Sequence, residues 1–395
     1  SGPELHGRER RRLGRRLGLK APGGPRPEAI GASRRARDRP IRRGSISLQA
    51  ILAILSCAGL SCATPSSESR PSERIAVSDG WMALGTFFEA DLRVAPGEEA
   101  TARAWLEWAR TEIARLEQVY SRWTPASELS ALNAALDRGD LEIRVGPELA
   151  TLLARARALS LETGGAFEIT VGPLVELWSR AARADRWPSE QALREARRRV
   201  GRDTFTLLEG PSGESARLKA AVSGLQIDLD GVSKGAVLDH LRDDLVVRLP
   251  TAAALLTFGQ SSVWAIGDPG ARGWRLAIES RDPARGSIGR IRLRDRALSV
   301  SSSVGSVLEI GGRAVSHVVD PRSGLVVQGT IEAIVVGDRA TAVDAWSTAL
   351  LVHGADLGAR EALALLDASP GLEACLIDSQ GLSEATSGWG GIRLE

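Results

Sequence analysis

The sequence predicts an α+β fold, in which mixed or antiparallel sheets pack against helices. Amphipathic segments with helical spacing and short strand-like segments follow one another without a regular repeat, and this pattern favours an α+β architecture over a barrel or a doubly wound sheet. The chain has 395 residues, of which 43% are hydrophobic and 25% are charged. Such a composition is that of an ordinary globular protein with room for a large core.

The first 62 residues read as a basic leader that ends in an export signal. An Arg-rich run to Arg43 precedes the apolar stretch ISLQAILAILSCAGLSC, and the polar segment ATPSSESRPSE follows. That order is typical of a secretory signal and a flexible linker, and the apolar stretch is too short for a good membrane-spanning helix. We expect a leader over residues 1–62, a linker over 63–78 and a globular body over 79–395.

Two of the three cysteines, Cys57 and Cys62, lie at the end of the apolar stretch, each after a serine. This arrangement resembles a bacterial lipoprotein signal, in which the cysteine becomes the lipidated first residue; the alternative is two incidental cysteines in a cleaved signal. We therefore expect an exported protein, on the outer side of the cytoplasmic membrane or in the periplasm, anchored by lipid at Cys57 or Cys62. Cys375 is the only cysteine of the body, so no disulfide framework or Cys-rich metal site is available there.

The charge of the chain is distributed unevenly. Residues 1–61 carry 14 Lys and Arg against 4 Asp and Glu, so the remaining residues carry 37 against 45 of the totals of 51 and 49. The body is therefore acidic. A basic surface for nucleic acid is not indicated outside the leader, and we expect no nucleic-acid partner.

The helices and strands of the body are predicted from the spacing of apolar residues and from the residues that typically begin and end such elements. The segment from Trp81 to Val94 indicates the start of a strand pair, and Ser189 is a helix-capping residue. The segments that predict helices are residues 97–123, 146–165, 189–201, 235–249 and 339–354. The segments that predict further strands are TFTLL (204–208), ARLKA (216–220) and LQIDLDG (225–231), whereas residues 120–133 and 165–178 read as loops.

The helix over residues 339–354 carries two oxygen-bearing side chains among apolar ones. Asp344 and Thr348 are four residues apart and therefore share one face. One interpretation is a solvated or capping stripe, because Asp near a helix start suits the helix dipole. The other is a hard-cation site, since carboxylate and hydroxyl oxygens suit magnesium or calcium.

Two further clusters are weak signals by themselves. Asp228 and Asp230 precede a turn at Gly231, and Lys234 follows at the start of the next helix; a glycine turn that opens a helix leaves N–H groups suited to phosphate, but the P-loop spacing is absent. A plain strand-turn-helix junction is the alternative. His317 begins the turn HVVDPRSG, where a histidine is either functional or simply solvated.

In combination, seven ordered segments from about Leu84 to Gly354 resemble the FAD:protein FMN transferases of the ApbE type. The segments similar to the motifs of that family are LGT (84–86), SRWTPASELSALN (121–133), GAFEITVGPLVELW (165–178), DLDGVSKGAVLD (228–239), FGQSSVWAIG (258–267), SHVVDPRSG (316–324) and AVDAWSTALLVHG (342–354). The resemblance implies an ApbE-like flavin transferase fold over residues 79–395. It also implies magnesium-dependent transfer of the FMN moiety of FAD to a Thr or Ser hydroxyl of an acceptor flavoprotein, with release of AMP.

The same resemblance implies roles for individual residues. Asp344, Thr348 and the backbone carbonyl of Gly231 correspond to magnesium ligands, with Ser347 adjacent. His317 corresponds to a general base that also contacts FAD, and an imidazole can take a proton from an attacking hydroxyl near neutral pH. The other implied FAD contacts are Leu84, Trp123, Ala166, Phe167 and Glu168 for the flavin side, and Asp228 and Lys234 near the adenine and the phosphates.

The chain departs from the family pattern at several positions. Glu168 stands where the family has Asp, Asp230 where it has Gly and Leu84 where it has Met, and ALSVSSSVGSV (297–307) replaces a T-S-G motif. Two alternative functions follow: an FAD-binding lipoprotein, or a magnesium-dependent FAD pyrophosphatase that transfers FMN to water instead of protein.

Overall fold

The computed structural model describes residues 74–391, apart from 209–215, 271, 283–284, 305–306 and 329–331. The leader predicted over residues 1–62, and most of the linker predicted over 63–78, lie outside the described residues. The end of the leader at residue 62 and the lipid anchor at Cys57 or Cys62 therefore stay predictions, whereas the predicted end of the linker at residue 78 falls inside a strand that begins at Ile75. Within the described part of the chain, no helix is both long enough and apolar enough to cross a bilayer.

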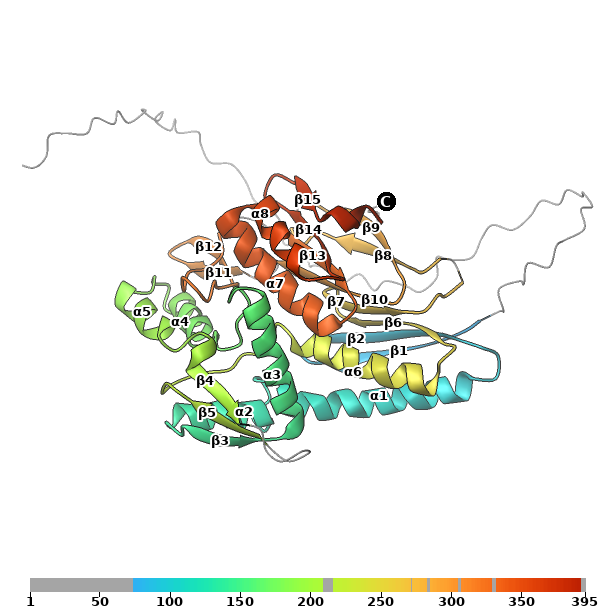
Figure 1. The fold of residues 1–395 in the computed structure, drawn as a ribbon, viewed down its shortest axis with the longest axis horizontal. Helices are drawn as coiled ribbons and strands as arrows, with labels where there is room; N and C mark the ends of the chain where they lie inside the picture. The colour runs from blue at the N-terminus through green and yellow to red at the C-terminus, as the bar shows by residue number, and fades with distance from the viewer. Residues whose placement is uncertain are drawn as a thin grey trace, which may run out of the picture. The chain divides into compact units, whose positions relative to one another are not determined.

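An eight-stranded sheet forms the centre of the body (Figure 1). All of its neighbouring strands pair in antiparallel fashion, so the sheet belongs to the antiparallel form of the predicted α+β class. In spatial order its strands are β1 (Ile75–Ala83), β2 (Thr86–Val94), β6 (Ala253–Phe258), β7 (Ser262–Ile266), β10 (Arg296–Ser302), β13 (Glu332–Gly337), β14 (Glu373–Ile377) and β15 (Ser383–Ala385).

Three smaller antiparallel sheets surround the central one. Their strands are β3 (Glu142–Val145), β5 (Ala216–Ala220) and β4 (Phe205–Leu208) in the first, β8 (Trp274–Glu279) and β9 (Ser287–Leu293) in the second, and β11 (Val307–Ile310) and β12 (Arg313–Ser316) in the third. The helices are α1 (Glu99–Tyr120), α2 (Glu128–Asp137), α3 (Pro147–Glu162), α4 (Gly172–Arg183), α5 (Glu190–Arg197), α6 (Ser233–Arg248), α7 (Ala340–Leu357) and α8 (Ala359–Ala364). Three short 3₁₀ turns are η1 (Arg202–Thr204), η2 (Leu365–Ala368) and η3 (Ser387–Gly391).

The five predicted helices are confirmed with boundaries that differ by a few residues, and the strand pair predicted to start near Trp81 is the β1–β2 hairpin. Three other predictions are wrong. The segment 120–133 is not a loop throughout, because α2 begins at Glu128, where the side chain of Ser127 caps the helix by accepting the Ser130 N–H at 3.0 Å. The segment 165–178 is not a loop throughout, because α4 begins at Gly172, with a proline in its first turn where no hydrogen-bonded N–H is needed. The segment 225–231 is not a strand: the Asn133 side chain satisfies both backbone groups of Ile227, with the N–H donating at 2.8 Å and the carbonyl accepting at 2.9 Å.

Apolar side chains cover both faces of the central sheet. In β13, Ala333 and Val335 belong to the core under α1, α6 and α7, whereas Ile334 and Val336 belong to a second core that includes the β8–β9 hairpin. Because successive side chains of a strand point to opposite faces, β13 presents apolar side chains from Ala333 to Val336 to both faces. The helices of the first face lie along the sheet in Figure 1.

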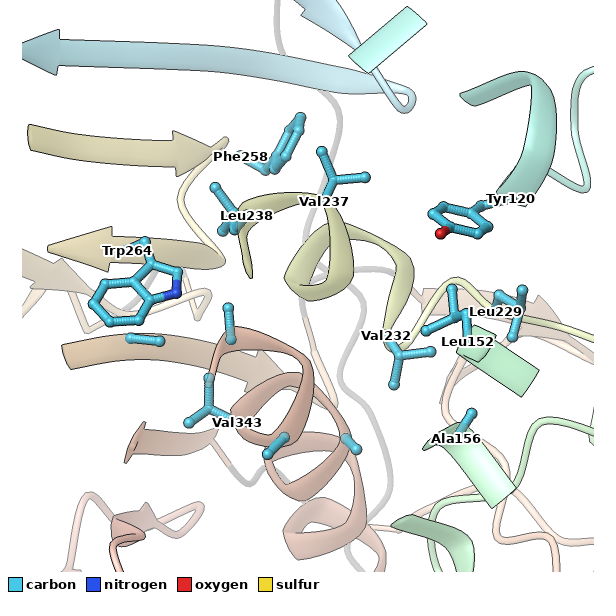
Figure 2. Packing of buried hydrophobic residues seen from close by; sticks show 14 of the residues in the cluster. Tyr120, Leu152, Ala156, Leu229, Val232, Val237, Leu238, Phe258, Trp264 and Val343 are labelled. Atoms are coloured by element: carbon cyan, nitrogen blue, oxygen red, sulfur yellow. The ribbon is translucent and has the colours of Figure 1, made fainter. Parts of the chain in front are cut away.

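Helices α6 and α7 approach each other closely above β7 and β10. A Cβ added at Gly235 of α6 would lie 2.4 Å from the carbonyl oxygen of Ala340 in α7, so only glycine fits at this crossing. Figure 2 shows part of the surrounding core, with Val237 of α6, Trp264 of β7 and Val343 of α7.

A buried carboxylate joins the two helices to the sheet. Asp239 of α6 accepts hydrogen bonds from the Ala340 N–H at 2.8 Å and from the Thr341 N–H at 3.0 Å, both in the first turn of α7. It also accepts from the Thr341 hydroxyl at 2.7 Å and from the indole N–H of Trp264 at 2.9 Å. The first N–H groups of a helix have no partner within the helix, and here the neighbouring helix supplies the acceptor.

Replacing Asp239 by Ala should therefore destabilise the fold strongly. The change leaves two backbone donors and one indole donor buried without an acceptor, and we expect a loss of about 3–5 kcal/mol in the free energy of unfolding. Asp243→Ala, one turn further along α6, removes a carboxylate that pairs with the half-exposed Arg339 and should cost under about 1 kcal/mol. Urea unfolding of both variants measures the difference. Equal losses would contradict the capping role.

Candidate active site

One cavity of about 650 Å³ brings together the side chains predicted to be functional, with the exception of Leu84. It lies where β7, β10, α6 and α7 meet the segments around Trp123, Phe167 and His317. The predicted residues that line it are Trp123, Ala166, Phe167, Glu168, Asp228, Gly231, Lys234, His317, Asp344 and Thr348. Leu84 instead occupies the turn of the β1–β2 hairpin, with a φ of 49°, and packs against the main core.

Asp344 is the most buried charged group of this cavity, with 5% of its surface exposed. Its Oδ2 accepts the N–H of Gly235 in the first turn of α6 at 2.7 Å, and its Oδ1 accepts the hydroxyl of Ser262 at 3.0 Å. Burial raises the pKa of the Asp344 carboxyl, against the lowering effect of the nearby Lys234 charge. These hydrogen bonds fix the Asp344 carboxylate in place, and the protein balances its negative charge only in part.

The oxygen donors around Asp344 fit a hard cation. Thr348 lies one turn further along α7, and its hydroxyl donates to the Asp344 carbonyl at 3.3 Å, which leaves lone pairs on its oxygen. A Cβ at Gly231 would lie 3.7 Å from this hydroxyl oxygen and 3.1 Å from the Phe167 ring, so the glycine keeps its backbone close to Thr348. One carboxylate, one hydroxyl and one carbonyl suit magnesium, which usually completes its shell with water and phosphate.

A cluster of protein carboxylates or imidazoles is not part of this site. Among the described residues, no group of three or more His, Cys, Asp or Glu side chains is placed to hold a metal ion. A cation in the cavity would therefore depend on Asp344, on neutral oxygens and on the phosphates of a bound substrate.

A rigid aromatic platform stands at the rim of the cavity. The indole of Trp123 is 72% exposed, and its N–H donates to Asp230 Oδ2 at 3.1 Å. The guanidinium of Arg122 covers the ring at 4.3 Å from its centre and pairs with both Asp228 and Asp230 at 3.1 Å. An exposed indole fixed in this way is a stacking surface for a planar ligand. Sequence reasoning missed Arg122, although its position directly before Trp123 is a usable signal.

Asp228 lies behind this platform with 10% of its side chain exposed. Burial raises the pKa of its carboxyl to about 6, together with the neighbouring charge of Asp230 and against the charges of Arg122 and Lys234. These three residues are the charged groups that act on it most strongly. The Asp228 carboxyl is therefore harder to ionise than an exposed aspartic acid, although it pairs with Arg122.

Glu168 has a structural role in the wall of the cavity. Its buried carboxylate accepts hydrogen bonds from the Ser160 hydroxyl at 2.7 Å, the Thr170 hydroxyl at 2.9 Å and the Thr170 N–H at 3.0 Å. Those bonds fix the segment that presents the buried Ala166 and Phe167 to the cavity. The longer Glu in place of Asp thus reaches back to α3.

His317 follows directly after β12, and its exposed side chain lines the same cavity. The turn behind it is held by Asp320, whose side chain accepts from the Arg322 N–H at 2.9 Å and from the Ser323 hydroxyl at 3.0 Å. His317 and Asp344 thus line one cavity, and an imidazole in such a place can accept a proton from a hydroxyl that enters the cavity.

The serine run near residue 300 faces the site. Ser299 and Ser301 line the cavity, and both make hydrogen bonds with the fully buried hydroxyl of Ser347 in α7, at 3.1 and 2.8 Å. The alternation of β10 turns Leu298 and Val300 to the other face of the sheet. The substituted motif therefore supplies a polar wall.

The raised pKa of Asp228 predicts a pH-dependent stability difference. A carboxyl whose pKa rises from 3.8 in the unfolded chain to about 6 in the fold contributes stability below pH 4, and that contribution is lost as the pH rises through 6. Asp228→Asn removes this titration and keeps an oxygen that accepts the Asp230 N–H. Relative to the unmodified protein, the variant should gain roughly 1–3 kcal/mol between pH 4 and pH 7.

Thermal unfolding of both proteins across that range, with Asp137→Asn as an exposed-carboxylate control, measures the gain. A difference between Asp228→Asn and the unmodified protein that stays constant with pH would refute a raised pKa.

Comparisons with known proteins agree with this geometry. A sequence profile of the ApbE family matches residues 84–376. The FAD:protein FMN transferase of Rhodobacter capsulatus is 32% identical over 305 residues, which cover 74% of this chain but only 55% of that protein. The FAD:protein FMN transferase of Klebsiella pneumoniae is 26% identical over 297 residues, covering 74% of this chain and 83% of that protein.

A solved structure shares the fold. The ApbE protein of Thermotoga maritima superimposes with a TM-score of 0.71 at 23% identity, over 81% of this chain and all of that one. The match of the profile to most of the chain, together with this fold, shows that the chain belongs to the ApbE family.

Proposed function

We propose that this protein is a magnesium-dependent FAD:protein FMN transferase, which moves the FMN moiety of FAD to a Thr or Ser hydroxyl of an acceptor flavoprotein and releases AMP. The observation that carries the proposal is the single cavity that joins Asp344 and Thr348, the imidazole of His317 and the exposed indole of Trp123. The similar transferases of other bacteria support it.

The residues of the chain have distinct tasks in this reaction. The Trp123 ring and the Phe167 wall would bind the planar flavin, and the N-terminal turn of α6 with Lys234 would bind the phosphates. Magnesium, held by Asp344, Thr348 and the Gly231 carbonyl, would neutralise charge on the pyrophosphate.

The covalent step is a substitution at phosphorus. The acceptor hydroxyl oxygen forms a bond to the FMN phosphorus, the bond from that phosphorus to the bridging oxygen breaks, and the bridging oxygen leaves with AMP. His317 accepts the proton of the hydroxyl. No oxidation or reduction occurs in this step.

Two alternative functions use the same cavity: that of an FAD-binding lipoprotein, and that of a pyrophosphatase that transfers FMN to water. A candidate base, His317, and the oxygen donors of Asp344 and Thr348 line one cavity. This combination favours catalysis over storage of FAD. An assay with FAD, magnesium chloride and a purified flavoprotein acceptor stripped of covalent flavin separates all three. Transfer gives flavin fluorescence on the acceptor in a denaturing gel with an equal amount of AMP, hydrolysis gives AMP without label, and storage gives neither.

Substitutions in the cation corner should act on transfer in a graded way. Asp344→Asn removes the charged ligand and should lower the transfer rate by roughly 100-fold or more. Thr348→Ala removes a neutral oxygen that water can replace, so we expect a loss of about 10-fold, partly recovered by added magnesium through mass action. Titration of magnesium with each variant, followed by AMP release and labelled acceptor, measures both effects.

Thr151→Ala is the matched control, because it removes a hydroxyl that, like that of Thr348, donates to a carbonyl of its own helix, here in α3 outside the cavity. Its transfer rate per folded molecule should equal that of the unmodified protein. FAD binding, followed by flavin fluorescence, should persist in part in all three variants. Full transfer activity of Asp344→Asn would contradict the assignment of Asp344 as a cation ligand.

We also propose that the mature protein is exported and anchored by lipid at Cys57 or Cys62. The order of basic, apolar and small residues before each cysteine supports this. Changing both cysteines to Ser should move the protein from the membrane fraction to the soluble fraction of the producing cells, and mass spectrometry should find an acyl-modified cysteine only in the unmodified protein. Unchanged membrane association of the double variant counts against the anchor.

A further inference from the structure

A second cavity of about 650 Å³ lies beside the first and has a different chemistry. It is bounded by the C-terminal end of α3, by α5 with the segment that follows it, and by the turn after His317. Five arginines line it: Arg194, Arg197, Arg198, Arg202 and Arg322. Ligand sites in proteins commonly have volumes of roughly 300–1,000 Å³, so the space suffices for several side chains of a bound segment.

The positive charge of this arginine cavity is only partly neutralised. Arg194 pairs with Glu190 at 3.2 Å and Arg202 with Asp203 at 3.5 Å. Arg322 pairs with Asp320 at 3.0 Å and with Asp356 at 3.3 Å. Among the described residues, no carboxylate forms an ion pair with Arg197 or Arg198. The body of the chain outside the leader is acidic, with 45 Asp and Glu against 37 Lys and Arg derived from the totals of 49 and 51, so this concentration of arginine runs against the general trend.

The one carboxylate in the lining cannot serve as the missing partner. Glu168 already accepts three hydrogen bonds from Ser160 and Thr170, and its side chain is 6% exposed. Arginines near the C-terminus of a helix also complement the helix dipole, which accounts for part of α5. That effect does not explain why Arg202 and Arg322, from two other segments, line the same cavity.

The two cavities share a wall. Glu168 and Pro321 line both of them, and the hydroxyl of Thr170 accepts the N–H of Gly201 at 2.8 Å, which ties the wall to the segment after α5. His317 and Arg322 belong to one short turn, with His317 in the flavin cavity and Arg322 in the arginine cavity. A chain bound to the arginines therefore lies next to the site of transfer.

We propose that the arginine cavity binds an acidic segment of the acceptor protein and so presents its target hydroxyl across the shared wall to His317. Arginine forks bind carboxylates in bidentate geometry, and several of them along one cavity select a segment that carries several carboxylates. This proposal rests on the proposed transferase function, because only a transferase has an acceptor protein. Recognition of an acidic peptide by these arginines can be measured without any transfer.

The first test uses a probe of known composition. Two synthetic dodecapeptides carry one central Thr and differ at four flanking positions, which are Glu in one and Gln in the other. Titration calorimetry with the full-length protein at low salt should give a dissociation constant at least tenfold lower for the Glu peptide. The preference should disappear in Arg197→Glu/Arg198→Glu, whose arginines support no ion pair that the fold needs.

The matched control is Arg103→Glu/Arg144→Glu, which changes the total charge equally at two exposed positions outside both cavities. It should keep the preference for the Glu peptide. Equal weakening by the two double variants would show general electrostatic attraction and overturn the proposal. Binding of sodium pyrophosphate at the arginines in preference to the Glu peptide would also overturn it, in favour of a small-anion site.

The second test follows transfer to a whole acceptor. In Arg197→Glu/Arg198→Glu, we expect KM for the acceptor to rise at least tenfold, while kcat changes less than twofold and the affinity for FAD is unchanged. A drop in FAD affinity would assign the arginines to the flavin site and defeat the proposal. If the protein transfers no FMN to any acceptor yet binds the Glu peptide through Arg197 and Arg198, the transferase function fails and the acidic-peptide site stands.

Discussion

The arrangement of the site depends on two helices that cap each other with buried carboxylates. Asp239 of α6 accepts the first N–H groups of α7, and Asp344 of α7 accepts the Gly235 N–H in the first turn of α6. Neither helix has a capping side chain of its own at its N-terminus. Because each helix supplies what the other lacks, and because Gly235 permits the close crossing, the two N-termini have one relative position. That position turns Gly231 and Lys234 toward the same cavity as Asp344 and Thr348.

Asp344 consequently combines a structural and a chemical role. Its Oδ2 accepts the Gly235 N–H and its Oδ1 accepts the Ser262 hydroxyl, and carboxylate oxygens have capacity for further partners. The cost of burying the charge is visible in the raised pKa of the carboxyl, and a bound cation would offset that cost. Loss of this side chain therefore removes two hydrogen bonds of the fold together with the proposed cation ligand. Replacement of Thr348, whose hydroxyl donates only to the Asp344 carbonyl, tests the proposed cation site more directly.

The sequence contained the fold class, the main helices and most of the cavity lining, because these depend on periodicity and on short motifs. It did not reveal the role of Asp239, the last residue of the motif at 228–239, because its partners Ala340 and Thr341 lie about a hundred positions away in α7. The apolar alternation of residues 225–231 predicts a strand that does not form, since the pairing of Ile227 with the Asn133 amide has no local signature in the sequence. Leu84 matched a motif, yet the hairpin keeps it apart from the other predicted residues. The sequence analysis did not single out the arginines of α5, because only the tertiary fold brings Arg202 and Arg322 to the same cavity.

The serine-rich segment at residues 297–307 departs from the family pattern, yet it still supplies polar side chains to the lining of the cavity. Strand alternation places Ser299 and Ser301 toward α7, where Ser347 bridges them, and Ser262 adds a hydroxyl to Asp344 from the neighbouring strand. Hydroxyls both donate and accept, so this wall can solvate a phosphate or a metal-bound water without adding charge. In the proposed function, the positive charge near the phosphates would come from Lys234 and from the cation, and the anionic Asp344 would be the protein group on which cation binding depends most.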